Sequence, residues 1–178
     1  LIYSGFPSTL IPDKINIIGK EKEILEFQNN VFEIIYKDHI AESNINLIYS
    51  IPAGIENITN TFFPGIKYMS EEKVLIQQNL MKNSKPTIYL NFSNKRFTNT
   101  VIEKNQLLLQ NSFNFNTKED MLYYILFCME QLRLSTETTN IVLYGNINKK
   151  DEKYKLLYEY IRNISFGEIT NSLTINIA

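Results

Sequence analysis

The stretch PTIYLNFSNKRFTNTVIEKNQLLLQNSFNFNTKEDMLYYILFCMEQLRL, residues 86–134, decides the fold. Its first part, 88–92, alternates apolar residues with neighbours of other kinds, the period of two that is typical of a β-strand. Two further extended runs follow at 97–103 and 106–115, and tight polar turns separate the three. Consecutive strands joined by short turns pair antiparallel, so the stretch predicts a three-stranded meander.

A helix is predicted directly after the meander. Thr117 is placed to cap it, and Asp120 lies three residues on, the spacing of a capping box. The residues that follow are apolar on nearly every side of a helix, with Met121, Leu122 and Ile125 on one side and several aromatic residues on the other. A helix that covers only one layer is not apolar all round. We therefore expect this helix to lie between the sheet and a second layer, which is either the other lobe or a partner.

The rest of the chain predicts a mixed α/β protein of two lobes. The segment 83–86 is polar and breaks helices, which places a first lobe at 1–84 and a second at 85–178. Residues 1–14 are expected to be irregular, and 53–63 is expected to be a helix with Ile55, Ile58, Phe62 and Phe63 on its buried face. The remaining expected elements are strands at 15–18, 31–36, 45–51, 66–69 and 141–143, helices after Gly19, at 71–83 and at 154–161, and extended structure within 164–178.

Composition excludes several classes of function. The net charge is −1, and Lys and Arg are scattered, so we expect neither a nucleic-acid nor a membrane partner. No apolar run is long enough to cross a bilayer, and the first 20 residues do not have the pattern of a signal peptide. The single cysteine, Cys128, falls in the apolar helix, which favours a reducing compartment and a cytoplasmic protein. The single histidine, His39, is expected in a solvated loop.

Motifs for catalysis and for metal binding are missing from the sequence. It contains no glycine-rich phosphate loop, no CxxC, no HExxH and no GxSxG. Its paired carboxylates, at 71–72, 119–120 and 151–152, precede or begin predicted helices, where the helix dipole explains them. We expect no catalytic residue and no metal ligand, and the sequence leans towards a protein that is not an enzyme.

From Pro86 onward the predicted order is β-β-β-α-β-α-β, which resembles one lobe of the actin-like, or ribonuclease-H-like, fold. The first lobe would be a partial copy of the same pattern. Several segments also resemble a bacterial family described as domain of unknown function 3822, across roughly residues 9–170. The resemblance implies an actin-like ATPase fold and a cytoplasmic bacterial protein, and it brings no established reaction. The segments are INLIYSIP (45–52), FFPGIKY (62–68), NSFNFNTKEDMLYYILFCMEQLRL (111–134), LYGNI (143–147) and YKLLYEYIRNISF (154–166).

The resemblance also implies where a nucleotide would bind. Actin-like proteins typically carry Asp-x-Gly after the first strand of the second lobe, and this chain has Asn91 and Ser93 at those positions. Asn lacks the charge that holds a hard cation, and Ser lacks the backbone freedom of Gly. The adenosine-contacting Gly-Gly turn corresponds to Gly145 and Asn146, a milder departure. These four residues are the candidate, altered nucleotide-binding positions.

Three functions remain open at this point. The first is a non-catalytic interaction or scaffold module that has a degenerate nucleotide site, no cofactor, and either a protein partner or a second copy of itself. The second is a nucleotide-binding protein or weak ATPase that uses ATP and Mg²⁺ in an altered cleft. The third, a ribonuclease-H-like nuclease, needs a cluster of carboxylates at strand ends, and no predicted strand supplies one.

Overall fold

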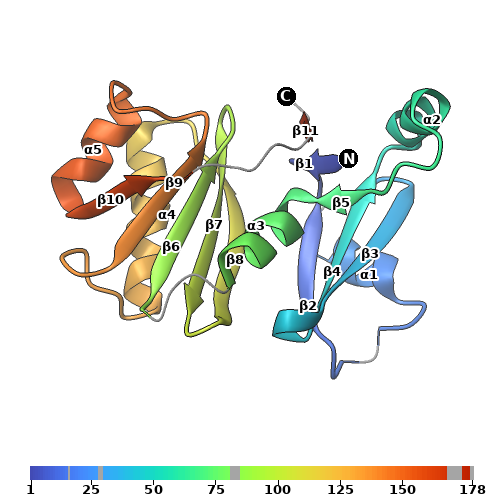
Figure 1. Cartoon of the computed structure of the whole chain (residues 1–178), viewed down its shortest axis with the longest axis horizontal. Coiled ribbons are helices and arrows are strands. Elements are labelled where there is room, and N and C mark those ends of the chain that lie inside the picture. The colour runs from blue at the N-terminus through green and yellow to red at the C-terminus, as the bar shows by residue number, and fades with distance from the viewer. Residues whose placement is uncertain (16, 28–29, 81–84, 168–173, 177–178) are drawn as a thin grey trace. The chain divides into compact units, whose positions relative to one another are not determined.

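A computed structural model describes residues 1–15, 17–27, 30–80, 85–167 and 174–176 of the chain (Figure 1). The chain forms two compact units, which comprise Leu1–Gln77 with Asn171–Ala178, and Gln78–Thr170. We call them unit 1 and unit 2. The expected boundary lay at 84/85, whereas the two units divide between Gln77 and Gln78, inside helix α3 (Glu71–Leu80). Within the described residues, no helix is both long and apolar enough to span a bilayer.

Unit 2 contains a five-stranded sheet in the order β10-β9-β6-β7-β8. Strands β6, β7 and β8 form the predicted antiparallel meander, while β9 pairs parallel with β6, and β10 parallel with β9. The chain order is β-β-β-α-β-α-β, as predicted. The bounds are β6 Thr87–Phe92, β7 Arg96–Glu103, β8 Gln106–Asn114, α4 Lys118–Gln131, β9 Asn140–Gly145, α5 Glu152–Tyr160 and β10 Asn163–Phe166.

One face of this sheet packs against α4 and α5. Alternation along each strand places Ile88, Leu90 and Phe92 on that face, where all three are buried in one apolar cluster. The opposite face of the same strands is more polar, and there Thr98 Oγ1 lies 3.0 Å from Ser112 Oγ. The other buried members of the cluster are Phe97, Val101, Phe115, Met121, Leu122, Ile125, Met129, Ile141, Leu143, Ile147, Leu157 and Ile161.

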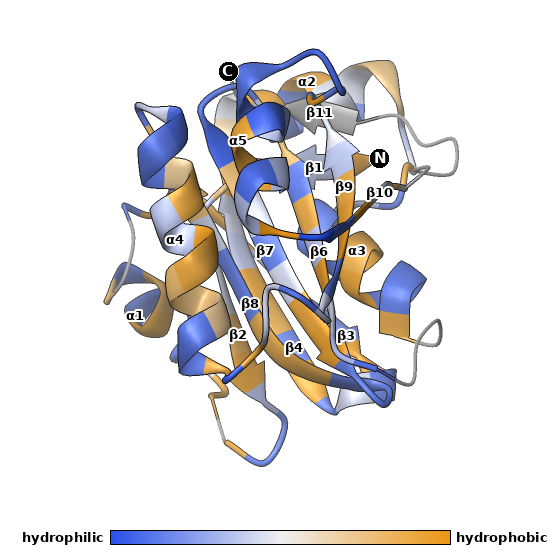
Figure 2. Cartoon of the chain, turned by 90° about the vertical axis from the view of Figure 1, so that its left-hand side faces the viewer, coloured by the Kyte–Doolittle hydropathy of each residue, from blue (hydrophilic) through white to orange (hydrophobic). Residues whose placement is uncertain are grey.

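Helix α4 begins as the sequence predicts and differs in its outer face. The capping box is present: the Asp120 N–H donates to Thr117 Oγ1 at 3.1 Å, and the Thr117 N–H donates to Asp120 Oδ2 at 3.0 Å. The outer face is not covered, however, because Tyr123 and Phe127 are 62% and 45% exposed. Much of α4 is hydrophobic in Figure 2. At these two side chains, therefore, α4 is not covered by the second layer that the sequence predicts.

Unit 1 contains two three-stranded sheets. The first, β2-β4-β3, is antiparallel, and the second, β11-β1-β5, is parallel. Helix α1 packs on the first sheet through an apolar cluster that includes Leu25 and Ile48. The bounds are β1 Ile2–Ser4, β2 Ser8–Pro12, α1 Glu21–Glu26, β3 Ile34–Ile40, β4 Ile45–Ile51, α2 Ala53–Phe62, β5 Met69–Ser70 and β11 Thr174–Asn176.

Several local predictions in unit 1 are wrong, including the strand at 66–69, where the structure has only β5. Residues 1–14 contain β1 and β2 where we expected irregular structure, because Gly5 and Pro7 interrupt the chain between the strands and not within them. Residues 15, 17 and 18 are not in a strand, whereas a strand was predicted at 15–18, of which residue 16 lies outside the described residues; Ile17 is buried against α1. His39 lies on β3, where its Nε2 is 2.6 Å from Asp13 Oδ2, and not in a loop.

Helix α2 forms where predicted, but most of its apolar face is exposed, and only Ile55 of the four predicted residues is half-buried. Ile58, Phe62 and Phe63 are 60%, 73% and 47% exposed, and Thr59 is the buried residue of the helix. Tyr36 donates a hydrogen bond from its hydroxyl to Glu56, which also lies on the inner face. The prediction of a buried apolar face is therefore wrong, because the residues beneath the helix are tyrosines whose hydroxyl groups require polar partners.

Candidate functional site

The four predicted nucleotide-site residues lie together at one edge of the unit 2 sheet. Strands β6 and β9 are adjacent and parallel, with Phe92 paired to Gly145. Their carboxyl ends therefore coincide, which places Asn91 and Ser93 beside Gly145 and Asn146. Ligands of open α/β sheets bind outside the carboxyl ends of the strands. The four residues therefore lie together at this edge, and their role in binding a nucleotide stays a prediction.

The two strand ends pack tightly against each other. Gly145 has φ of +77°, and a Cβ built on it would lie 2.1 Å from the Phe92 carbonyl oxygen and 2.7 Å from Asn91 Oδ1. The Asn146 N–H donates to the Phe92 carbonyl oxygen at 2.7 Å. Only glycine fits at position 145, and it brings the backbone of β9 into direct contact with the end of β6.

Backbone N–H groups at this edge already have partners within the protein. The Ser93 N–H donates to the Arg96 carbonyl at 3.0 Å, and the Ile147 N–H donates to the Gly145 carbonyl at 2.9 Å. Phosphate groups are commonly bound by such N–H groups where a strand gives way to a turn or helix. At this edge, a phosphate would have to compete with hydrogen bonds that the fold itself makes.

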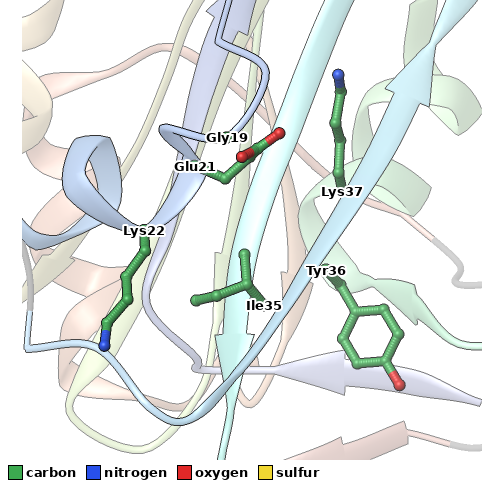
Figure 3. Close-up of a pocket in the computed structure, with 6 residues that line it drawn as sticks. All are labelled: Gly19, Glu21, Lys22, Ile35, Tyr36 and Lys37. Atoms are coloured by element: carbon green, nitrogen blue, oxygen red, sulfur yellow. The ribbon is translucent and has the colours of Figure 1, made fainter.

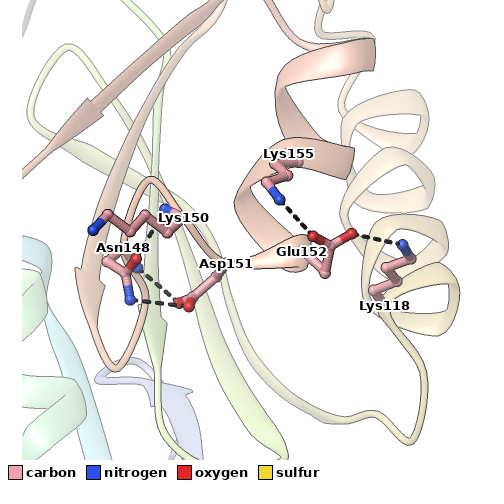
Figure 4. Close-up of polar contacts among 6 residues, drawn as sticks. All are labelled: Lys118, Asn148, Lys150, Asp151, Glu152 and Lys155. Atoms are coloured by element: carbon pink, nitrogen blue, oxygen red, sulfur yellow. Dashed lines mark hydrogen bonds and ion pairs between the residues drawn. The ribbon is translucent and has the colours of Figure 1, made fainter.

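The loop between β9 and α5 satisfies its own polar groups in the same way (Figure 4). Asp151 accepts from the Asn148 N–H at 2.8 Å and from Asn148 Nδ2 at 2.9 Å. The Lys150 N–H in turn donates to Asn148 Oδ1 at 2.9 Å. The loop is therefore a closed turn whose donors face inward to its own side chains.

Two carboxylates near this edge also accept hydrogen bonds from groups of the protein itself. Glu152 accepts hydrogen bonds from Lys155 Nζ at 2.6 Å and from Lys118 Nζ at 3.4 Å, and these two ammonium groups lower its pKa (Figure 4). Backbone N–H groups at the start of α4, above all that of Thr117, lower the pKa of Asp120. Among the described residues, no group of three His, Cys, Asp or Glu side chains is arranged to hold a metal ion.

Lys153 is a cationic side chain that lies at the strand ends, and the sequence did not indicate it. Its Nζ donates to the Asn146 carbonyl oxygen at 3.3 Å, and it lies 5.5 Å from the ring centre of Phe92 and 5.9 Å from that of Phe115. In the sequence, Lys153 belongs to the charged run 149–153, which has the composition of a solvated linker. Only the tertiary fold brings it over two aromatic rings.

A separate cavity of about 300 Å³ lies in unit 1, between the segment before α1 and strand β3 (Figure 3). Ile35 points towards that segment, while the Tyr36 ring points away from the cavity. The charged residues around it are of both signs: Glu21, Lys22 and Lys37. The mixture gives no preference for an anion or a cation, and none of the predicted site residues lines this cavity.

Comparison with known proteins identifies the family and the fold. A family model described as protein of unknown function (DUF3822) matches residues 1–164. A solved structure from Bacteroides thetaiotaomicron VPI-5482, described as a protein with an actin-like ATPase fold and unknown function, matches with a TM-score of 0.84 and 21% sequence identity. The match covers 93% of this chain and 66% of that one, so this chain spans just under two thirds of its length. No curated protein matches. The predicted actin-like fold is thereby confirmed.

Proposed function

Because the chain belongs to the family of proteins of unknown function DUF3822, we propose its function from its own geometry: a non-catalytic interaction module whose actin-like nucleotide site is degenerate. The observation that supports a degenerate site is that the N–H groups of Ser93, Asn146 and Ile147 donate hydrogen bonds to carbonyl groups of the protein itself. A phosphate would have to break these bonds, and no carboxylate stands at position 91 to hold its cation.

Exposed apolar side chains support the proposal that the protein is an interaction module. Phe62, Tyr123 and Ile58 are 73%, 62% and 60% exposed, on helices α2 and α4. Single exposed apolar residues are ordinary, whereas several on one helix face mark an interaction surface. A cytoplasmic location fits the single thiol, Cys128, which is buried in α4.

A thermal-shift titration with ATP and Mg²⁺ tests the degenerate site. A ligand present at 100 times its Kd stabilises the folded protein by about 2.7 kcal/mol, which gives an easily measured rise in Tm. We expect no rise at millimolar ATP. A saturating, Mg²⁺-dependent rise would show that the site binds nucleotide and would overturn the proposal.

The second candidate function, a nucleotide-binding protein or weak ATPase, is favoured by one specific observation. The fold gathers Asn91, Ser93, Gly145 and Asn146 at one edge and adds the ammonium group of Lys153 beside Asn146. An ammonium group binds phosphate as a point charge. If the thermal shift is positive, Lys153→Gln should reduce it, whereas Lys67→Gln, an exposed lysine of unit 1, should not.

A further inference from the structure

Helix α2 has its polar face inside and its apolar face outside. On the inner face, Glu56 accepts a hydrogen bond from Tyr36, and Asn60, which is exposed at the rim of this face, accepts one from Tyr68. The Thr59 hydroxyl oxygen lies 3.2 Å from the hydroxyl oxygen of Tyr68. A surface helix of a soluble protein ordinarily buries its apolar stripe. Here the inner polar groups are satisfied, so the orientation of the helix is established by its own contacts.

The tyrosines beneath α2 hold this orientation. Tyr3 and Tyr68 stack with ring centres 5.2 Å apart, and Tyr36 lies 5.7 Å from Tyr68. Burial, and after it the hydrogen bond to Glu56, raise the pKa of Tyr36, so its hydroxyl remains a donor at neutral pH. Rotating α2 to bury its apolar face would leave these hydroxyl groups without their partners, and each buried polar group left unsatisfied costs roughly 1–3 kcal/mol.

The outer face therefore presents Ile58, Phe62 and Phe63 towards solvent, with Ile55 half-buried at its edge. Figure 1 shows α2 at one end of unit 1, next to the ends of β3 and β4. Ile55, Ile58 and Phe62 have the spacing i, i+3, i+7 at which one helix anchors on an apolar surface. We infer that this face binds the same face of a second copy of the chain, which deepens the proposed function because it names the interaction surface of the module.

Charge on and around the face favours a second copy as the occupant. From Ala53 to Ile66 the only charged residue is Glu56, and it points inward to Tyr36. The other exposed residues of the helix are Gly54, Asn57, Asn60 and Thr61, none of which is charged. Two copies therefore meet without repulsion between like charges, and a strongly charged partner finds nothing complementary. The Asn and Thr side chains around the apolar face can also form hydrogen bonds with the same side chains of the second copy.

The pattern along the helix is also self-complementary. In a two-fold, antiparallel pair centred next to residue 58, Ile55 of one copy faces Phe62 of the other, and Ile58 faces its own counterpart. The exposed fractions of Ile58, Phe62 and Phe63, for side chains of roughly 150–250 Å², expose on the order of 350 Å² per copy. A stable dimer buries about 800 Å² per partner. The contact is therefore a weak, transient one that forms at high protein concentration.

Sedimentation velocity between roughly 1 μM and 1 mM protein tests the pairing. We expect monomer at the low end and dimer at the high end. The double variant Ile58→Gln, Phe62→Gln should weaken dimerisation at least tenfold, and it removes no buried side chain. Phe27→Gln is the matched control, because Phe27 is 89% exposed elsewhere in unit 1 and should leave dimerisation unchanged.

Crosslinking tests the two-fold geometry directly. Ile58→Cys should form a disulfide between two copies under a mild oxidant, whereas Phe27→Cys should not; the native thiol of Cys128 is buried and does not compete. A monomer across the whole concentration range, or a dimer unaffected by the α2 variants, overturns the inference. The second result would leave the interaction module standing, whereas the proposed function itself fails if ATP and Mg²⁺ stabilise the protein.

Discussion

Replacing Gly145 by alanine should destabilise unit 2 strongly, because two separate costs meet at this residue. The backbone there has φ of +77°, and a left-handed conformation costs a non-glycine residue roughly 1–2 kcal/mol. The added Cβ would also lie 2.1 Å from the Phe92 carbonyl oxygen, inside the 3.0 Å that real Cβ atoms keep. Relieving this contact separates the ends of β6 and β9 and weakens the Asn146 hydrogen bond, at about 1 kcal/mol more. We expect a total loss of roughly 2–3 kcal/mol in the free energy of unfolding.

Urea unfolding of three glycine variants separates these costs. Gly65 also has a positive φ, +78°, but nothing lies within 4 Å of its Cβ position, so Gly65→Ala should cost only the roughly 1–2 kcal/mol of backbone strain. Gly54 lies within α2 with open space around it, and Gly54→Ala should stabilise unit 1 by up to about 1 kcal/mol. For each variant, the urea transition of the unit that contains the substitution is compared with the same transition of the wild-type protein. If Gly145→Ala is as mild as Gly65→Ala, the close packing of the two strand ends is refuted.

Three further predictions concern single side chains. Thr117→Ala removes the capping box of α4 and should cost about 1 kcal/mol in urea unfolding, whereas Thr117→Ser should retain most of it; equal losses would show that the hydroxyl does not cap. Tyr36 has a raised pKa, so its contribution to stability is complete below the unfolded tyrosine pKa of about 10 and is lost as pH rises above that value; pH-dependent urea midpoints should fall above about pH 10, and less so in Tyr36→Phe. Burial raises the pKa of the Cys128 thiol, so it should react with a disulfide reagent at pH 8 only after urea is added, and fast labelling of the native protein would contradict its burial in α4.

Much of unit 2 could be predicted from sequence because its signals are local. The alternation over 88–92, the short turns and the Thr117 cap each depend on neighbouring residues, and each is found in the structure. The order of elements followed directly and resembled one lobe of the actin-like fold, which the comparison with a solved structure confirmed. The parallel pairing of β11 with β1 could not be found in this way, because it joins residues more than 170 positions apart. Neither strand has more than three residues, so neither gives a periodic signal of its own.

The α2 prediction failed for a different physical reason. A helical apolar pattern shows that Ile58 and Phe62 share a face, but it does not show what lies on the other side of the helix. That depends on Tyr3, Tyr36 and Tyr68, which come from three different strands or loops and meet only in the folded unit. Their hydroxyl groups make the inner environment polar. Aromatic residues were treated as apolar in the sequence pattern, and so the polar end of each tyrosine was overlooked.

The candidate site shows where sequence reasoning about chemistry stops. Residues that follow parallel strands can be expected to gather, as Asn91, Ser93, Gly145 and Asn146 do. Whether they can bind an anion depends on the direction of each N–H, which no side-chain motif records. The positive φ of Gly145 turns the chain so that the Asn146 N–H meets the Phe92 carbonyl at 2.7 Å. Gly145, which the resemblance assigns to the nucleotide-contacting turn, therefore directs the Asn146 N–H into the protein, and this geometry is the physical basis of the proposed degenerate site.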